Sequence, residues 1–261
     1  MPLMELLNVA GNLLEVQTLE PDKGSVGLAP LVLLHEGLGS VSMWRDWPAL
    51  VGRATDRTVR VYSRRGYGRS APVPDVRGTG RLPPDYLHRE AWEVLPALLE
   101  YLGITQPVLL GHSDGASIAL LYASRFPVRA CIAMAPHVMV EAVSLRSIAA
   151  ARDAFVDGDL RQRLARHHAD VDGAFWQWND AWLNPAFGSF DIRADCRRIT
   201  APVLALQGSE DPYGTMAQID QIDLPAHQIR RVALPACGHS PHRDAPDATL
   251  AAIVDFLATI G

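Results

Sequence analysis

The sequence predicts an α/β fold in which a mostly parallel sheet is covered by helices on both faces. Three observations lead to this class. Six short apolar runs recur along the 261 residues, helical patterns separate several of them, and a glycine-bearing or polar loop follows most of them. Buried strands that alternate with helices are typical of parallel sheets. The length suits one domain of this class that carries an insertion.

The six apolar runs are expected to form strands. Each is short, apolar and bounded by loop residues, as is typical of a buried strand. They cover residues 29–35, 58–63, 106–110, 129–133, 202–207 and 228–234. The last run alternates between apolar and polar residues, which predicts a position at the edge of the sheet. Residues 13–18 are a further candidate strand.

Three segments have the pattern of helices. In residues 91–102 the apolar side chains recur at the spacing of one helix face. Pro96 lies inside this pattern and is expected to kink the helix. Residues 115–126 are apolar and rich in alanine, and residues 248–257 form an amphipathic pattern after a Pro-Asp start signal.

The segment 137–201 interrupts the alternation of strands and helices. It has no strand pattern, and six of the chain's twelve Phe and Trp residues lie between positions 175 and 190. A segment of this length without structure of its own is uncommon. We therefore expect an inserted helical cap at 137–201 over a core formed by residues 1–136 and 202–261.

Composition and charge exclude several classes of partner. The formal net charge of −5 argues against nucleic acid and anionic membrane surfaces. No uninterrupted apolar run reaches the roughly 18 residues of a membrane span, and the first eleven residues hold no Lys or Arg, unlike a secretory signal. The three cysteines have no metal-binding spacing. We expect a cytoplasmic protein that binds no metal or cofactor and acts on a small molecule. The sequence leaves open whether it is a monomer or a homodimer.

The stretch GHSDG, residues 111–115, predicts a nucleophile. It follows an expected strand and precedes an expected helix, the context in which Gly-x-Ser-x-Gly presents a reactive serine. Glycines two residues before and after Ser113 remove side chains that would clash in so tight a turn. The turn would place the Ser113 hydroxyl at a helix N-terminus, where developing negative charge is favoured.

A base and a carboxylate follow Ser113 in the expected order. His239 comes after the sixth expected strand, and Asp211 comes directly after the fifth, with Glu210 as the alternative carboxylate. The order Ser113, Asp211, His239 is the one this type of turn requires. All three positions follow strands, at the sheet edge where open α/β sheets bind ligands.

These motifs together resemble the α/β-hydrolase fold. The resemblance is to its lid-bearing group, which includes carboxylesterases, enol-lactonases and ring-cleavage-product hydrolases, and it extends from about residue 31 to residue 257. The motifs are HEGLG at 35–39, SRRGYGRS at 63–70, the elbow at 111–115, GSED at 208–211 and Gly-His at 238–239.

The resemblance implies an oxyanion hole formed by the backbone N–H groups of Gly37 and Asp114. Two residues depart from the family pattern, because Glu36 replaces a glycine and Asp114 replaces an apolar residue. Carboxylates beside a site that stabilises an anion oppose catalysis. Either both side chains point away and bind backbone groups or Arg64 and Arg65, or Glu36 faces the pocket and binds substrate or water. The sequence leaves both possibilities open.

Other residues are candidates for the pocket wall. His137 follows the fourth expected strand and either lines the pocket or is structural. Trp178 and Trp182 lie on one expected helix face, which forms the interior of the cap and supplies part of the apolar pocket. His167 and His168 follow several arginines and are expected on a solvated basic face.

The expected activity is hydrolysis of a small carboxylic ester or lactone through an acyl-enzyme on Ser113. One alternative is hydrolysis of a carbon–carbon bond in a vinylogous diketone by the same three residues. That reaction calls for a cation to hold a substrate carboxylate, which Arg64, Arg65 or a cap arginine would supply. A second alternative is a non-catalytic ligand-binding protein that kept the fold.

Overall fold

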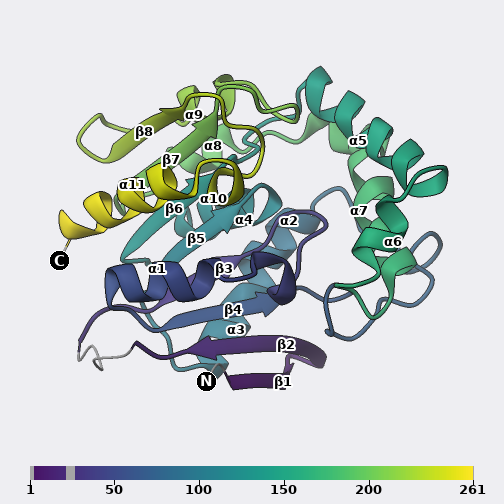
Figure 1. Cartoon of the computed structure of the whole chain (residues 1–261), viewed down its shortest axis with the longest axis horizontal. Coiled ribbons are helices and arrows are strands. Elements are labelled where there is room, and N and C mark those ends of the chain that lie inside the picture. The colour runs from purple at the N-terminus through teal and green to yellow at the C-terminus, as the bar shows by residue number, and fades with distance from the viewer. Residues whose placement is uncertain (1–2, 22–26, 261) are drawn as a thin grey trace.

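The computed structural model describes residues 3–21 and 27–260, which form an eight-stranded sheet (Figure 1). The strand order is β1-β2-β4-β3-β5-β6-β7-β8. β1 pairs with β2, and β2 with β4, in antiparallel orientation, whereas all other neighbours are parallel. The strands are β1 Leu3–Val9, β2 Asn12–Leu19, β3 Leu31–Leu34, β4 Val59–Ser63, β5 Val108–His112, β6 Ala130–Met134, β7 Val203–Gly208 and β8 Ile229–Leu234.

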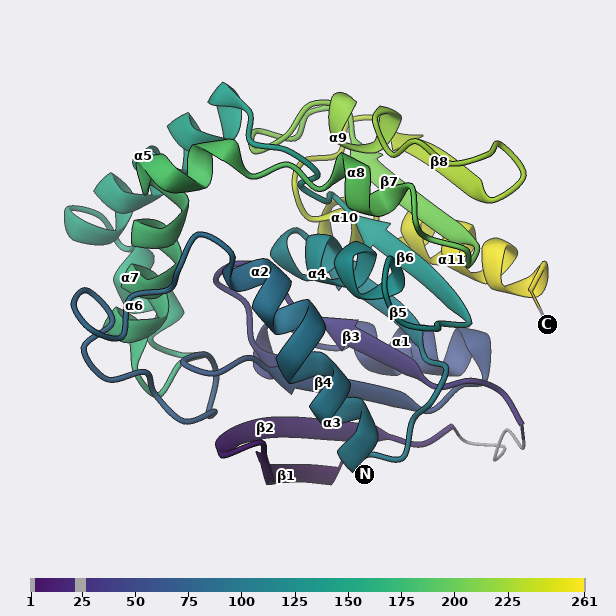
Figure 2. The same ribbon diagram turned by 180° about the vertical axis from the view of Figure 1, so that it is seen from behind.

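Helices cover both faces of the sheet, as predicted. One face is covered by α1 and α11, in front of the sheet in Figure 1, and the other by α2, η2, α3 and α4, in front in Figure 2. The core helices are η1 Val41–Trp44, α1 Trp47–Thr55, α2 Tyr86–Arg89, η2 Glu90–Val94, α3 Leu95–Tyr101, α4 Asp114–Ala123, α9 Ala217–Asp220, α10 Pro241–Asp244 and α11 Pro246–Ala258.

Strand β3 explains why the sheet needs cover on both sides. All four of its residues are buried, and successive side chains of a strand point to opposite faces. Leu31 and Leu33 belong to the apolar cluster beneath α1 and α11. Val32 and Leu34 belong to the cluster beneath α2, α3 and α4. A strand buried in this way is typical of a parallel sheet between two helical layers.

The predicted strands are confirmed, and each begins and ends within two residues of its expected bounds. β8 is an edge strand, as its alternating pattern predicted. β1 was not predicted. It forms a hairpin with β2 through Ala10 and Gly11, both with positive φ. Helix α1 was not predicted either.

The helix predicted around Pro96 is longer than expected and changes its winding. The helical segment begins at Tyr86 and passes through a π-helical stretch, η2, before continuing as α3. Pro96 is the second residue of α3 and cannot donate a backbone hydrogen bond. The predicted irregularity is therefore a π segment directly before the proline, a common way to accommodate such a break.

The segment 137–201 is helical and lies beyond the carboxyl ends of the parallel strands (Figure 2). Near its two ends, an isolated antiparallel bridge joins Met139 to Asp191. Its helices are α5 Ala142–Val156, α6 Leu160–Leu164, α7 Val171–Trp182, η3 Pro185–Ser189 and α8 Arg193–Cys196. This arrangement brings α5 and α7 over the loops that follow β5, β7 and β8.

Candidate active site

The turn between β5 and α4 holds Ser113 in a strained conformation. Its φ is 53° and its ψ is −118°, a combination that non-glycine residues rarely adopt. A Cβ on Gly111 would lie 2.2 Å from the Gly115 carbonyl oxygen, and one on Gly115 would lie 2.0 Å from the Leu34 carbonyl oxygen. Both positions therefore require glycine, because the neighbouring backbone leaves no room for a side chain.

A chain of hydrogen bonds links Ser113 to a histidine and an aspartate. The Nε2 atom of His239 is 2.9 Å from Ser113 Oγ, and its Nδ1 atom is 2.8 Å from Asp211 Oδ2. The loops after β5, β7 and β8 thus bring together the three residues selected from the sequence. Glu210, the alternative carboxylate, is exposed to solvent.

Asp211 is held as an anion by fixed donors. Its Oδ1 accepts the backbone N–H of Tyr213 at 2.7 Å, and its Oδ2 also accepts a Gln207 amide hydrogen at 2.8 Å. Burial favours the neutral carboxyl, but the bond to His239 and the backbone bond outweigh it and lower the pKa of Asp211. The carboxylate can therefore orient His239 and stabilise its protonated form.

The two backbone N–H groups expected to form an oxyanion hole have no competing partners within the described residues. Within the described residues, neither the Gly37 nor the Asp114 N–H donates a hydrogen bond to the protein. Gly37 also passes close under the ring of Trp178, since a Cβ at position 37 would lie 2.1 Å from Trp178 Nε1. A side chain there would displace the α7 tryptophan.

Ser113 opens into a cavity of about 210 Å³. The four side chains selected from the sequence as substrate-binding candidates, Glu36, His137, Trp178 and Trp182, all line it, as do Gly37, Leu38, His112, Asp114, Ile148, Tyr213, His239 and Ser240. Burial lowers the pKa of His137 to about 3, so this histidine is a neutral part of the wall. Both readings of His137, pocket wall and buried structural residue, thus hold.

The Glu36 carboxylate pairs with charged and polar groups beside the cavity. Its Oε2 lies 3.5 Å from His112 Nδ1, and its Oε1 lies 3.8 Å from an Arg243 nitrogen. Burial alone would raise its pKa, but His112 and Arg243 hold the pKa of Glu36 well below its usual range. Glu36 is therefore an anion at the cavity wall.

The Asp114 side chain belongs to a buried network of hydrogen bonds and charges. Its Oδ2 accepts the Tyr86 hydroxyl at 2.7 Å, and its Oδ1 accepts the Trp182 indole N–H at 3.2 Å. The Arg64 guanidinium lies 3.7 Å from Oδ2. Burial raises the pKa of Asp114 despite these partners. The contact with Arg64 is one of those predicted for Asp114, whereas Glu36 lines the cavity.

The expectation that His168 lies on a solvated basic face is wrong. Its side chain is buried, its Nδ1 accepts the Gly68 N–H at 3.0 Å, and its Nε2 donates to the Leu38 carbonyl at 3.0 Å. The neighbouring arginines suggested exposure, but the chain turns so that this ring packs inward. His168 thus ties the helical segment to the loop that carries Gly37.

Several residues of the site were not predicted from the sequence. Tyr86 and Gln207 hold the two aspartates, and Tyr213 places its ring 4.7 Å from that of His239. Gln207 and Tyr213 flank the GSED motif, so their proximity to Asp211 in sequence is a usable signal. Tyr86 lies 28 residues from its partner, and no local pattern marks it.

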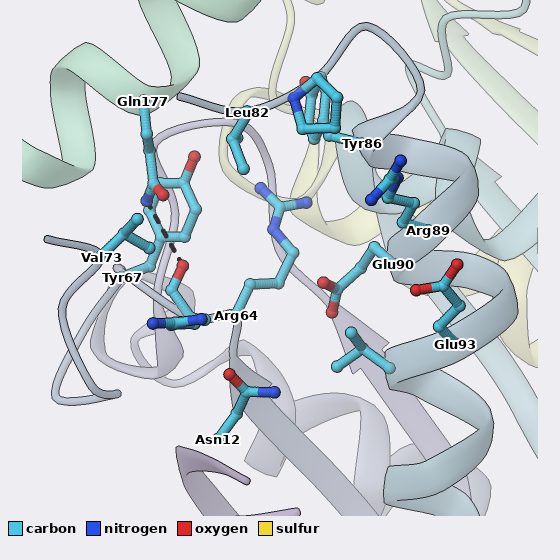
Figure 3. Close-up of a pocket in the computed structure, with 13 residues that line it drawn as sticks. Asn12, Arg64, Tyr67, Val73, Leu82, Tyr86, Arg89, Glu90, Glu93 and Gln177 are labelled. Atoms are coloured by element: carbon cyan, nitrogen blue, oxygen red, sulfur yellow. Dashed lines mark hydrogen bonds between the residues drawn. The ribbon is translucent and has the colours of Figure 1, made fainter. Parts of the chain in front are cut away.

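Arg64 and Arg65 line a different cavity from Ser113. This second cavity, of about 250 Å³, lies between the 64–73 turn, α2, η2 and α7 (Figure 3). No arginine is among the residues that line the Ser113 cavity.

Across residues 3–21 and 27–260, no group of three or more His, Cys, Asp or Glu side chains could hold a metal ion. In that same part of the chain, no helix has the length and apolarity to cross a membrane.

Several known proteins are similar to this chain. A proline iminopeptidase of Lactobacillus acidophilus is 33% identical over 95 residues, which cover 36% of this chain and 30% of that protein. The chain thus aligns with less than a third of that relative's length. A 2-(acetamidomethylene)succinate hydrolase of Mesorhizobium japonicum is 25% identical over 258 residues, covering 88% of this chain and 89% of that protein.

A solved structure extends the likeness to the whole fold. The enol-lactonase of Burkholderia xenovorans LB400 superposes with a TM-score of 0.70 at 23% identity, over 97% of this chain and 100% of that one. At this identity the likeness concerns the fold alone. The sequence pattern of the alpha/beta hydrolase family matches residues 31–252. The chain is therefore a member of the α/β hydrolase family.

Proposed function

We propose that this protein is a serine hydrolase that cleaves a small carboxylic ester or lactone through an acyl-enzyme on Ser113. The observation that carries the proposal is the chain of hydrogen bonds from Asp211 through His239 to Ser113, at 2.8 and 2.9 Å. A serine hydroxyl becomes an effective nucleophile when a positioned base takes its proton. The same geometry argues against a non-catalytic binding protein, because binding alone needs no such relay.

The geometry suggests the role of each group. Ser113 Oγ attacks the substrate carbonyl while His239 Nε2 accepts its proton, and Asp211 stabilises the imidazolium. The N–H groups of Gly37 and Asp114 donate to the oxygen that becomes negative in the tetrahedral intermediate. His239 then gives the proton to the leaving alkoxide. Water, deprotonated by His239, attacks the acyl-enzyme and releases the acid.

The cavity supports a small substrate with an apolar part. Its volume of about 210 Å³ is modest, and Trp178, Trp182 and Ile148 form much of its wall. These three residues belong to α5 and α7, so we assign residues 137–201 as a cap over the core formed by residues 1–136 and 202–261. We further propose a cytoplasmic location and no requirement for a metal or cofactor.

Carbon–carbon bond hydrolysis is less well supported. The cation expected to hold a substrate carboxylate is absent from the residues that line the Ser113 cavity, because Arg64 and Arg65 line the other cavity. The ionised Glu36 would in addition repel a substrate carboxylate. We therefore favour an ester or a lactone that carries no negative charge next to Glu36.

The test is a hydrolysis assay with p-nitrophenyl esters of increasing acyl length, small aliphatic lactones and a dienoate diketone. Short esters or lactones are expected to be cleaved, and Ser113→Ala is expected to lose about 10⁴-fold or more in kcat. Ser240→Ala, which alters another serine of the same cavity, is the matched control. A fluorophosphonate should label Ser113 in the folded protein. No label and no hydrolysis would overturn the proposal, and preferential diketone cleavage would favour the alternative reaction.

A further inference from the structure

Arg64 is a buried cation in contact with both parts of the expected oxyanion hole. It directly follows β4, and only 5% of its surface is exposed. Figure 3 shows its side chain extending toward Leu82 and Tyr86, with Glu90 beside it. Arg64 lies in the turn between β4 and the helices, and the proton-transfer chain of the proposed function does not use it.

The first contact is with the loop that carries Gly37. Arg64 donates from Nη1 to the His35 carbonyl oxygen at 3.3 Å and from Nη2 to the Glu36 carbonyl oxygen at 3.0 Å. The Glu36 carbonyl and the Gly37 N–H belong to one planar peptide group. A donor that fixes the carbonyl therefore also fixes the direction of the Gly37 N–H, which lies in the same plane and points the opposite way.

The second contact is with the residue that supplies the other N–H. Nη2 of Arg64 lies 3.7 Å from Asp114 Oδ2, and the side chains of both residues are almost fully buried. An uncompensated carboxylate at this position would oppose the negative charge that develops on the substrate oxygen. The guanidinium cation offsets that charge while it holds the Gly37 peptide.

We propose that Arg64 is a positioning residue for the oxyanion hole, which orients the Gly37 N–H through the Glu36 carbonyl and offsets the charge of Asp114. The inference rests on the proposed serine-hydrolase function. Arg64 acts on the transition state through its neighbours and does not touch the substrate. Its loss should therefore lower kcat and leave KM nearly unchanged.

The first test compares Arg64→Met with Arg65→Met, the neighbouring exposed arginine of the same cavity. We expect Arg64→Met to lower kcat by about 10- to 100-fold, less than the loss of an oxyanion donor itself, and Arg65→Met to have little effect. Fluorophosphonate labelling to completion counts the folded active sites, so kcat is expressed per labelled site. A purely structural role for Arg64 would reduce the number of sites and leave kcat per site intact, which would overturn the proposal.

A transition-state analogue gives a second readout. A trifluoromethyl ketone forms a tetrahedral adduct on a serine and places an oxyanion in the hole. Its inhibition constant should rise in Arg64→Met by the same factor by which kcat/KM falls. Arg64→Met that binds the ketone as tightly as the wild type would contradict the inference. The double variant Arg64→Met/Asp114→Asn should recover part of the lost kcat, since it removes the charge that Arg64 offsets.

The cavity beside Arg64 permits a third test that does not depend on how Arg64→Met folds. In Arg64→Ala, millimolar guanidinium chloride can enter the space of about 250 Å³ and the room left by the side chain. We expect it to restore part of kcat, whereas sodium chloride at equal ionic strength should not. Equal effects of the two salts would count against the proposal. If wild-type enzyme hydrolyses no ester or lactone, the proposed function fails first, and the inference falls with it.

Discussion

Two aspartates flank Ser113, and they differ in what surrounds them. The side chains of Asp211 and Asp114 are both about 1% exposed. Asp211 bonds to His239, whose ring also reaches the serine hydroxyl, and its pKa is lowered. Asp114 bonds to Tyr86 and Trp182, faces Arg64, and its pKa is raised. Asp114 is the more deeply buried residue, and burial is the largest cause of its raised pKa, whereas the bonds from His239 and Tyr213 outweigh burial at Asp211.

We infer from this comparison that the chemical role of a buried carboxylate depends on whether its partner is a base in contact with the reacting atoms. His239 is a base that can gain a proton and stands between Asp211 and Ser113. The donors around Asp114 keep their protons throughout, so they fix its position and cannot relay charge. We therefore expect the Asp211 side chain to take part in the reaction and the Asp114 side chain to stabilise the structure around the site.

The largest expected effect is the difference in kcat between two variants, Asp211→Asn and Asp114→Asn. Asp211→Asn removes the charge that holds the correct His239 tautomer and should lower kcat by about 10⁴-fold. Asp114→Asn keeps the backbone N–H that faces the oxyanion and should change kcat by less than about tenfold. Steady-state kinetics with the preferred ester, normalised to fluorophosphonate-labelled sites, measures both. Similar losses of kcat in the two variants would contradict the different roles assigned to the two aspartates.

The proximity of Ser113, Asp211 and His239 could be predicted from the sequence. Ser113, Asp211 and His239 each follow a strand, and parallel strands deliver their carboxyl ends to one edge of the sheet. The order of the motifs and the glycines of the elbow then select the residues. The partners of Asp114 could not be predicted, because they come from α2 and α7, at sequence distances of 28 and 68 residues. Only the packed structure brings them together.

The same limit explains the errors in the sequence analysis. His168 follows arginines in sequence, but its two ring nitrogens complete the hydrogen bonds of Gly68 and Leu38, which lie about 100 residues or more away. The neighbouring arginines predicted an exposed His168 side chain. The ring is buried instead because backbone groups far away in the sequence need hydrogen-bond partners. Strand β1 was missed for a different reason. It is an edge strand, and most of its residues are exposed, so its buried and exposed residues do not alternate clearly.

The second prediction concerns stability and reverses the order of the two aspartates. Asp114→Leu leaves the buried Arg64 cation without its nearest carboxylate and should lower the free energy of unfolding by about 3 kcal/mol. Asp211→Leu leaves one Gln207 hydrogen and the Tyr213 N–H unpaired, beside a partly exposed His239, and should cost about 1–2 kcal/mol. Urea unfolding at pH 7.5 compares them. A larger loss for Asp211→Leu would contradict the assigned roles.

The third prediction extends the comparison from buried acids to buried bases. Burial lowers the pKa of His168 to about 4 and that of His242 to about 2. The unfolded chain then binds more protons than the folded protein below about pH 6.5. Stability is therefore complete above that pH and falls as the pH drops toward the folded pKa, by about 1.4 kcal/mol per pH unit for each such histidine.

His242 provides the matched variant for this pH dependence. Neither of its ring nitrogens has a hydrogen-bond partner within the described residues, and its ring packs 4.9 Å from that of Trp44. His242→Phe keeps a ring and removes the titrating group. It should reduce the slope of unfolding free energy between pH 6.5 and 4.5 by about 1.4 kcal/mol per pH unit. An unchanged slope would show that burial does not keep His242 neutral.

The smallest expected effect belongs to Glu210, the carboxylate next to Asp211. Glu210 and Asp211 share a loop and an acidic side chain, but Glu210 is exposed to solvent, where its charge is screened. Glu210→Gln should change kcat by less than about twofold and leave the unfolding free energy within about 0.5 kcal/mol. The measurement uses the same ester assay and urea titration as the Asp211 variants. A large loss of kcat would show that proximity in sequence, and not contact with His239, determines which carboxylate acts.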